Sequence, residues 1–289
     1  MSTPAAVTVN RVTQDPDSPA LPPSIALAWG LRQHPRRGPK PGLTLDRIVA
    51  AGIKVALTEG LAGVSMGRVA GELGVATMSL YRYVSAKDDL LTLMVDAAIG
   101  TPPLAEPLDG DWRAGLTGWA VGVRAAYRRN LWALRVPISA PPVGPNNVAW
   151  LEAALRVLGG TALSESQKLS TVLLLSFFVR SEVTLAADIA AGSGGGPVDF
   201  GYGDMLATLT DPALFPALHR AMAAGAFDDG DDRDAYFNYG LGRILDGVGR
   251  LADERGRRPP APAAGGGDGG RAERRAESRR SRQSSRRDD

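Results

Sequence analysis

Cysteine is absent from this chain of 289 residues, and histidine occurs only at His34 and His219. Without thiols the protein can form no disulfide framework, thiolate nucleophile or thiolate metal site. No apolar run approaches the roughly 20 residues that a membrane-spanning helix needs. The polar, proline-rich start also lacks the charged and then apolar pattern of a secretion signal. We therefore expect a cytoplasmic protein that does not span a membrane.

Enzyme motifs are missing as well. The sequence holds no G-x-S-x-G, H-E-x-x-H or Walker pattern, and the glycine-rich stretch 192–196 is not followed by the Lys and Ser or Thr that would bind phosphate. Gly240 and Gly242 fit only the start of a dinucleotide fingerprint, and they lie in a helical segment rather than after a strand. We therefore expect no catalytic residues and no bound cofactor.

Positive charge is concentrated in two parts of the chain. The net charge is only +2, but residues 30–91 carry nine Lys and Arg against five Asp and Glu, and residues 255–289 carry 11 against five. Residues 92–254 carry 12 basic and 19 acidic residues. A basic segment suits a protein that binds a polyanion, because neutralising phosphates releases counterions. An excess of this size also occurs on ordinary protein surfaces.

Apolar residues recur with helical spacing almost throughout, interrupted by Pro and Gly clusters, and no convincing alternating strand is present. The sequence therefore predicts an all-α protein. Residues 1–23 and 256–289 have almost nothing apolar to bury and are expected to be disordered. The predicted helices cover residues 45–60, 65–73, 76–83, 88–99, 112–127, 147–158, 168–191, 211–224 and 233–252.

Several helix ends carry recognisable signals. Thr44 is the expected N-cap of the first helix, and Ser85 with Asp88 forms a variant of the capping box before the fourth. Ser164 and Gln167 form a regular capping box ahead of the long helix 168–191.

Ala70, Gly74 and Leu80 have the spacing of a helix-turn-helix. Ala70 lets two helices cross closely, Gly74 permits a left-handed turn residue, and Leu80 anchors the second helix in the core. The triplet alone is common by chance, but here it coincides with the predicted helix ends. We therefore predict a DNA-reading unit at this position.

The residues that follow resemble the L-Y-x-[HY]-[FV]-x-x-K-x-x-L-L signature of the tetracycline-repressor (TetR) family. The resemblance to the family's N-terminal domain covers residues 43–99, and a weaker one to the C-terminal domain of tetracycline repressors continues to about Leu251, notably at 111–129 and 235–251. The signature is carried by Leu80, Tyr81, Arg82, Tyr83, Val84, Lys87, Leu90 and Leu91.

The resemblance implies that the helix 76–83 enters the major groove of double-stranded DNA while the helix 65–73 lies across the backbone. Tyr81 and Tyr83 would then contact sugar and phosphate, although both can instead pack the domain. Where tetracycline repressors have a base-reading arginine, this chain has Gly67, with Arg68 beside it as a candidate reader. The implied DNA contacts are Thr44, Ser65, Arg68, Thr77, Ser79, Tyr81, Arg82, Tyr83 and Lys87.

Two basic segments outside the predicted helices can each be interpreted in two ways. Arg36 and Arg37 lie among Pro and Gly residues that keep the chain extended, as in an arm that follows the minor groove, or they form a solvated linker. The Arg-rich tail 271–287 either adds phosphate affinity or only improves solubility.

In the resembling family, two long C-terminal helices of each subunit form a four-helix dimer interface, here 168–191 and 233–252. Sequence cannot decide which apolar side chains of these helices belong to that interface and which to the subunit core. The side chains in question are Leu169, Val172, Leu173, Val183, Ile244 and Val248. Gly240, Gly247 and Gly249 would allow close helix packing.

A small apolar or aromatic effector molecule is the expected ligand. Trp119, Trp132, Phe177 and Phe178 are the candidate pocket residues, with a plain core role as the alternative for each. A magnesium-tetracycline chelate is not expected, because no histidine lies between His34 and His219, and the family's metal-linked glutamate falls at Leu185.

These observations predict a disordered basic arm (1–41), a three-helix helix-turn-helix domain (42–101), a helical ligand-binding and dimerisation domain (102–254) and a disordered tail (255–289). The expected function is a ligand-released repressor that binds a palindromic operator as a homodimer. A transcriptional activator of the same fold and a helical adaptor without DNA binding remain as alternatives.

Overall fold

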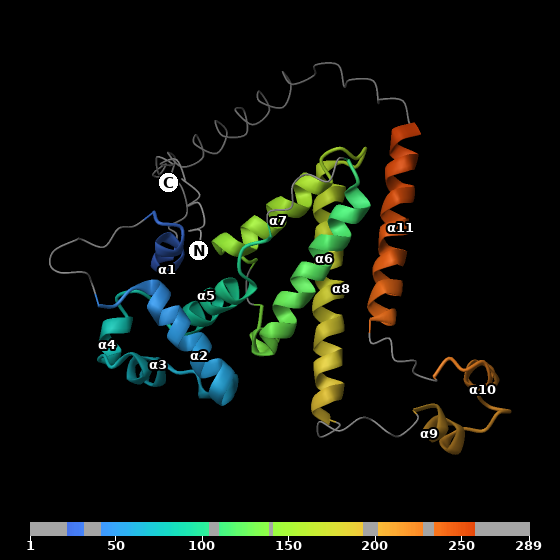
Figure 1. Cartoon of the computed structure of the whole chain (residues 1–289), viewed down its shortest axis with the longest axis horizontal. Coiled ribbons are helices and arrows are strands. Elements are labelled where there is room, and N and C mark those ends of the chain that lie inside the picture. Colours follow the sequence, from blue (N-terminus) through green and yellow to red (C-terminus); the bar gives the residue numbers. More distant parts are fainter. Residues whose placement is uncertain are drawn as a thin grey trace, which may run out of the picture.

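The computed structural model describes residues 22–31, 42–103, 110–138, 141–192, 202–227 and 234–257. Throughout these ranges the regular structure is helical, which confirms the all-α prediction (Figure 1). None of the described helices is long and apolar enough to cross a membrane. Buried apolar side chains gather into two clusters, one around the short N-terminal helices and one inside the long C-terminal helices.

The N-terminal unit consists of α2 (Leu45–Gly63), α3 (Met66–Leu73), α4 (Thr77–Leu80) and α5 (Lys87–Ile99). Thr44 caps α2 as predicted, because its hydroxyl accepts a hydrogen bond from the Arg47 N–H at 3.2 Å. The predicted stop at Gly60 is present as a non-helical residue with φ 75°, although one further turn follows it.

The capping prediction at α5 is wrong in detail. The carboxylate that accepts the Ser85 N–H, at 3.1 Å, belongs to Asp89 rather than Asp88, and the helix begins after Ala86. The N-cap, Ala86, lies one residue after the expected Ser85, so the side chain that reaches back also lies one position further along.

A helix that the sequence did not predict precedes this unit. α1 (Pro23–Ala28) begins with proline at its first turn, where the missing N–H costs nothing. Ile25 is buried in the N-terminal cluster, and Ala26 is buried as well. The expectation that residues 1–41 form a disordered arm is therefore wrong for this stretch, because a short apolar run after a proline-rich segment finds a surface that only the folded chain provides.

The C-terminal unit is a bundle of α6 (Trp112–Arg129), α7 (Pro145–Val157), α8 (Glu165–Gly192) and α11 (Ala235–Arg257). A 3₁₀ helix, η1 (Leu131–Arg135), connects α6 to the segment before α7. The predicted capping box of α8 is confirmed: the Ser164 N–H donates to Gln167 Oε1 at 3.0 Å, and the Gln167 N–H donates to Ser164 Oγ at 3.4 Å.

Only part of the helix predicted over 211–224 is helical, and a second short helix precedes it. α9 (Tyr202–Leu209) was not expected, and α10 (Pro216–Ala223) begins later than predicted because Pro216 starts it. Figure 1 shows the pair apart from the bundle, and Tyr202 packs edge-on against Phe227 with ring centroids 5.8 Å apart.

Candidate DNA-binding interface and sensor

The turn between α3 and α4 has the geometry that the sequence spacing predicts. Gly74 adopts φ 67° and ψ 33°, the left-handed conformation that favours glycine. Its N–H donates to the Gly71 carbonyl at 3.2 Å, and the Val75 N–H donates to the Ala70 carbonyl at 3.0 Å, which closes the end of α3. Ala70 and Leu80 are buried. The helix-turn-helix is thus present.

The outer side of α4 carries the side chains that are free to contact another molecule. Met78 is 74 % exposed and Tyr81 46 % exposed, large fractions for apolar side chains. Arg82 and Lys87 are exposed as well, and Thr77 and Ser79 are half-buried. Met78 was not among the predicted contacts, although it lies three positions before Tyr81 and therefore on the same helix face.

Tyr83 points the other way. The side chain is only 7 % exposed, and its hydroxyl donates to the Leu43 carbonyl at 2.8 Å. This contact fastens the turn after α4 to the segment that leads into α2. Of the two roles that the sequence left open, the structure supports packing and not DNA contact.

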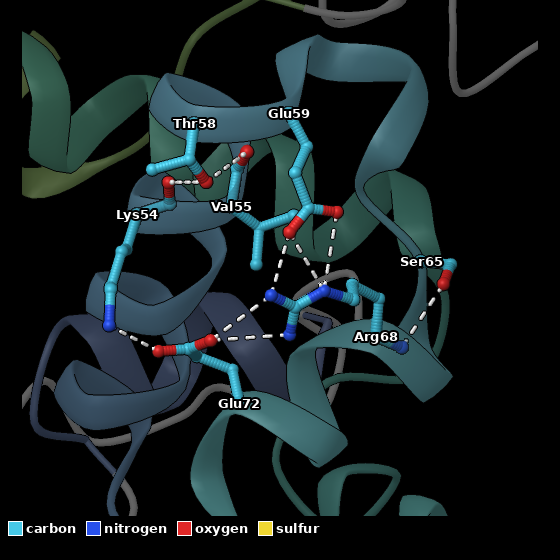
Figure 2. A network of polar contacts seen from close by, with 7 residues as sticks. All are labelled: Lys54, Val55, Thr58, Glu59, Ser65, Arg68 and Glu72. Carbon is cyan, nitrogen blue, oxygen red and sulfur yellow. Dashed lines mark hydrogen bonds and ion pairs between the residues drawn. The ribbon is translucent and has the colours of Figure 1, made fainter.

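Arg68 lies inside a network of ion pairs (Figure 2). Its guanidinium donates to Glu59 of α2, with distances of 2.7 and 2.9 Å to Oε1, and to Glu72 Oε2 at 3.2 Å. Lys54 adds a bond to Glu72 at 2.5 Å. Hydrogen bonding to Glu59 first, and to Glu72 second, raises the pKa of Arg68, and the bond with Lys54 is the main reason that the pKa of Glu72 is lowered.

The network changes the role expected for Arg68. Because its donors face two carboxylates of the same domain, the side chain holds α3 against α2 instead of extending toward a partner. The spacing of Arg68 and Glu72 was a usable sequence signal, since residues four apart on a helix pair readily. Lys54 and Glu59 lie on another helix, so sequence could not connect them.

The remaining predicted DNA contacts are at helix starts or outside the described ranges. Ser65 is exposed, and its hydroxyl accepts the Arg68 N–H at 3.1 Å as the N-cap of α3. Gly67 follows, with no described atom within 4 Å of the position that a Cβ would take. Arg36 and Arg37 lie outside the described residues.

The four predicted pocket residues do not share one site. Trp119 is buried in the bundle, where its indole N–H donates to the Trp150 carbonyl at 2.8 Å. Trp132 of η1 belongs to the N-terminal cluster, and its buried N–H has no hydrogen-bond partner among the described residues. Phe178 stacks on Phe237 with centroids 5.6 Å apart, and Phe177 is 61 % exposed.

A hollow of about 370 Å³ lies between η1 and α8. Arg180 crosses it and donates to the Leu134 carbonyl at 2.8 Å, and Arg135 pairs with Asp188. None of the four predicted aromatic residues lines it. The lining residues are Leu134, Arg180, Ser181, Thr184, Leu185 and Asp188.

The apolar residues of α8 fall on two faces. Val172 and Val183 are buried in the subunit's own core, and so is Val248 of α11. The opposite side of α8 leaves large side chains uncovered, and α11 adds two tyrosines. The uncovered residues are Leu169, Leu173, Leu174, Phe177, Leu185 and Ile189 of α8 with Tyr236 and Tyr239 of α11.

Comparisons with known proteins agree with this arrangement. Residues 48–94 match the description "Bacterial regulatory proteins, tetR family", and residues 103–251 match "Tetracyclin repressor-like, C-terminal domain". The repressor DrrR1 of Streptomyces coeruleorubidus is 36 % identical over 248 residues, which cover 80 % of this chain and 87 % of that protein. The chain belongs to the TetR family.

This TetR-family chain also resembles solved structures of the same family. Apo ActR from Streptomyces coelicolor superposes with a TM-score of 0.62 at 28 % identity, covering 75 % of this chain and 99 % of ActR. ActR in complex with actinorhodin gives 0.63, also at 28 % identity, covering 73 % and 98 %. The class A tetracycline repressor of Escherichia coli is 27 % identical over 71 % of this chain and 90 % of its own length.

Membership of the family settles what the helix-turn-helix is for. The chain is a DNA-binding transcriptional regulator with a C-terminal domain of the tetracycline-repressor type. At Gly67, where the family resemblance implies a base-reading arginine, the chain has no side chain, and the guanidinium of neighbouring Arg68 is already paired with Glu59 and Glu72.

Proposed function

We propose that the protein is a ligand-released repressor that binds a palindromic operator as a homodimer. The observation that carries the proposal is that one subunit presents two separate exposed surfaces: the outer side of α4, and the apolar side of α8 with α11. A single helix-turn-helix reads only a few base pairs, whereas a symmetric dimer reads two related half-sites.

The operator surface centres on α4. Tyr81 is exposed beside Met78, and Lys87 at the start of α5 is placed to neutralise a phosphate. Thr77 and Ser79 lie on the same short helix and provide hydroxyls for base edges or phosphates. Thr44, Ser65 and Arg82 extend this surface, and Arg36 and Arg37 are proposed to add phosphate or minor-groove contacts.

The dimer surface is the uncovered side of α8 with α11. Leu173 and Phe177 lie four positions apart and share one face, whereas Leu175 and Val179, also four apart, are fully buried on the other. A helix with two apolar faces is expected where one packs into its own subunit and the other against a partner. A second copy of α8 and α11 would complete a four-helix interface.

The effector is proposed to be a small apolar or aromatic molecule. The bundle is rich in tryptophan and phenylalanine. In the N-terminal cluster, the buried Trp132 N–H is a donor that a ligand oxygen could satisfy. ActR, a relative of similar fold, has been solved with actinorhodin. Actinorhodin is therefore the first compound to test.

Repression is favoured over activation because DrrR1, which aligns with most of this chain, is named a repressor. Catalysis has no place in the proposal, since the family is one of regulators.

Selection of bound fragments from the source genome, followed by footprinting, tests the proposal. We expect protection of an imperfect palindrome by a dimer and a steep fall in affinity with rising salt. A monomer that protects a single unrepeated half-site would contradict the proposed dimer. A DNA affinity that does not change with salt concentration would favour a helical adaptor without specific DNA binding.

Release from the operator by an effector is tested by a separate measurement. A ligand that lowers operator affinity must itself bind less tightly to the operator-bound dimer, by the same factor. Actinorhodin affinity is measured with and without saturating operator. Weaker binding to the operator-bound dimer supports release, tighter binding contradicts it, and equal values show that the compound binds without inducing.

A further inference from the structure

The carboxylate of Asp96 is a buried polar link between the DNA-reading unit and the bundle. Asp96 lies near the C-terminal end of α5 and is only 4 % exposed. Its Oδ1 accepts the backbone N–H of Asn147 at 2.8 Å and the side-chain amide of Asn147 at 2.7 Å. Its Oδ2 accepts the backbone N–H of Asn146 at 3.2 Å and the side-chain amide of Asn146 at 3.1 Å.

These bonds supply a cap that α7 does not have of its own. The first N–H groups of a helix have no partner within the helix, and a Ser, Thr, Asp or Asn at the N-cap normally satisfies them. Here the N-cap is Gly144, which has no side chain, and Pro145 follows it. Asp96 therefore caps α7 from another helix, and its negative charge suits the positive end of the α7 dipole.

The fit at this point is close enough to require glycine. A Cβ on Gly144 would lie 2.2 Å from Asp96 Oδ1, although the backbone angles of Gly144, φ −68° and ψ 149°, suit any residue. The glycine is needed for space and not for conformation. We call Asp96, Gly144, Asn146 and Asn147 the α5–α7 joint.

The N-terminal helix braces the same joint. Trp29, at the end of α1, donates its indole N–H to the carbonyl of Val143 at 2.8 Å. Val143 directly precedes Gly144, while Ile25 of α1 is buried in the cluster that contains Leu91 of α5. α1 thus connects α5 with the segment that begins α7.

The joint joins two units that are each firmly packed. Leu90 and Met94 of α5 are fully buried, and a Cβ on Gly52 of α2 would lie 2.6 Å from the Met94 sulfur, so α5 moves together with α2. On the other side, Trp150 and Ala154 of α7 are buried inside the bundle. The α5–α7 joint therefore helps to set the orientation of the helix-turn-helix relative to the bundle, together with the bonds from Asn130 to the Ala98 carbonyl and from Trp150 to the Gly100 carbonyl.

We propose that Asp96 is a positioning residue for operator binding. By capping α7 it sets the tilt of α5 relative to the bundle. In a dimer, the tilts of the two α5 helices set the distance between the two recognition helices α4. Trp29 supports the same joint through its bond to the Val143 carbonyl. This inference rests on the proposed dimeric operator binding. It assigns the preferred spacing of the two half-sites to a carboxylate that touches no DNA.

The test compares the selected operator with versions that have one base pair added or removed between the half-sites. The parent should bind the altered spacings more weakly. Asp96→Asn keeps the shape but offers one accepting oxygen to four donors. The preference is measured as the ratio of the affinity for the natural spacing to the affinity for an altered spacing. In Asp96→Asn this ratio should be smaller than in the parent by about fivefold or more, because coupling between communicating sites begins at about that factor.

Other variants separate positioning from general damage. Trp29→Phe removes the indole N–H together with one ring of the indole, and Asn147→Ala removes one of the four bonds, so both should also weaken the spacing preference. Leu116→Val loosens the fully buried centre of the bundle without touching the joint and should keep the parental preference. Folding and dimerisation of each variant are checked by thermal unfolding and light scattering.

Every outcome decides between the two ideas. If the parent prefers one spacing and Asp96→Asn keeps that preference, the proposal is overturned and the proposed function stands. If Asp96→Asn does not fold, unchanged preference in both Trp29→Phe and Asn147→Ala overturns the proposal, and a weakened preference supports it. A parent that binds no paired half-sites overturns the proposed function and the inference with it.

Discussion

Phe178 of α8 lies directly against Gly240 of α11, where a Cβ on the glycine would come within 2.6 Å of the ring. The same ring stacks on Phe237, one helical turn before Gly240. Glycine at this position lets the two long helices approach closely. The close approach that the sequence suggested for Gly240 is thus present within one subunit.

Replacing Gly240 with Ala should destabilise the protein. Alanine normally improves a helix interior by roughly 1 kcal/mol relative to glycine, but forcing an extra methyl into a packed contact costs about 1–3 kcal/mol. We expect the second effect to win and the melting temperature at fixed protein concentration to fall. Gly118→Ala is the control, since Gly118 is exposed on α6 with no described atom near its Cβ position, and there the melting temperature should rise. A rise in both variants would contradict the contact.

Tyr81 and Tyr83 should respond in opposite ways. Tyr81→Ala removes an exposed ring and should weaken operator binding with little change in stability. Tyr83→Phe removes the hydroxyl that donates to the Leu43 carbonyl, which should lower stability by about 1 kcal/mol and leave the operator affinity of the folded protein unchanged. Gel-shift titrations and urea unfolding on the same preparations measure both. Weaker operator binding by folded Tyr83→Phe would show that the Tyr83 hydroxyl contributes to DNA binding.

Arg68 and Arg82 offer a matched pair of cations. Arg82 is exposed beside α4, so Arg82→Ala should reduce the slope of log affinity against log salt by about 1. Arg68 is paired with Glu59 and Glu72, so Arg68→Ala should leave that slope unchanged and lower the melting temperature slightly. Salt titrations with random DNA measure the slopes. A reduced slope for Arg68→Ala would show that its guanidinium leaves the network to meet phosphate.

Acid should weaken the contact between α11 and α6. The hydrogen bond with Arg124 lowers the pKa of Asp234, followed by the charge of the same guanidinium. Because the pKa is lower in the folded state than the ordinary value near 4, the stabilisation is complete above about pH 4 and is lost as pH falls through the folded pKa. Asp234 is half exposed, so salt reduces the effect.

The expected result is a melting temperature for Asp234→Asn that lies below the parent's at pH 7, with a difference that closes as pH falls below about 4. Asp253→Asn, at an exposed position of α11, should follow the parent at every pH. A constant difference between Asp234→Asn and the parent from pH 7 to pH 3 would show that the carboxylate's charge does not matter.

The sequence by itself determined the features that depend on near neighbours. Helix periodicity, the caps at Thr44, Ser65 and Ser164, and the left-handed turn at Gly74 are set by residues within a few positions of one another. These local signals sufficed for the all-α fold and the helix-turn-helix. The family signature named Tyr81 and Tyr83 alike as DNA contacts, and only the structure shows that Tyr81 is exposed and Tyr83 buried.

Only the tertiary structure decided which side chains already have hydrogen-bond or ion-pair partners within the protein. Arg68 meets Glu59 of another helix, Tyr83 meets a carbonyl 40 residues away, and Asp96 caps a helix 50 residues further on. No local pattern contains these partners, because hydrogen bonds and ion pairs form wherever folding brings a donor to an acceptor. The same holds for α1, whose few apolar residues become a helix only against α5 and the segment before α7, since so short a helix is not stable alone in water.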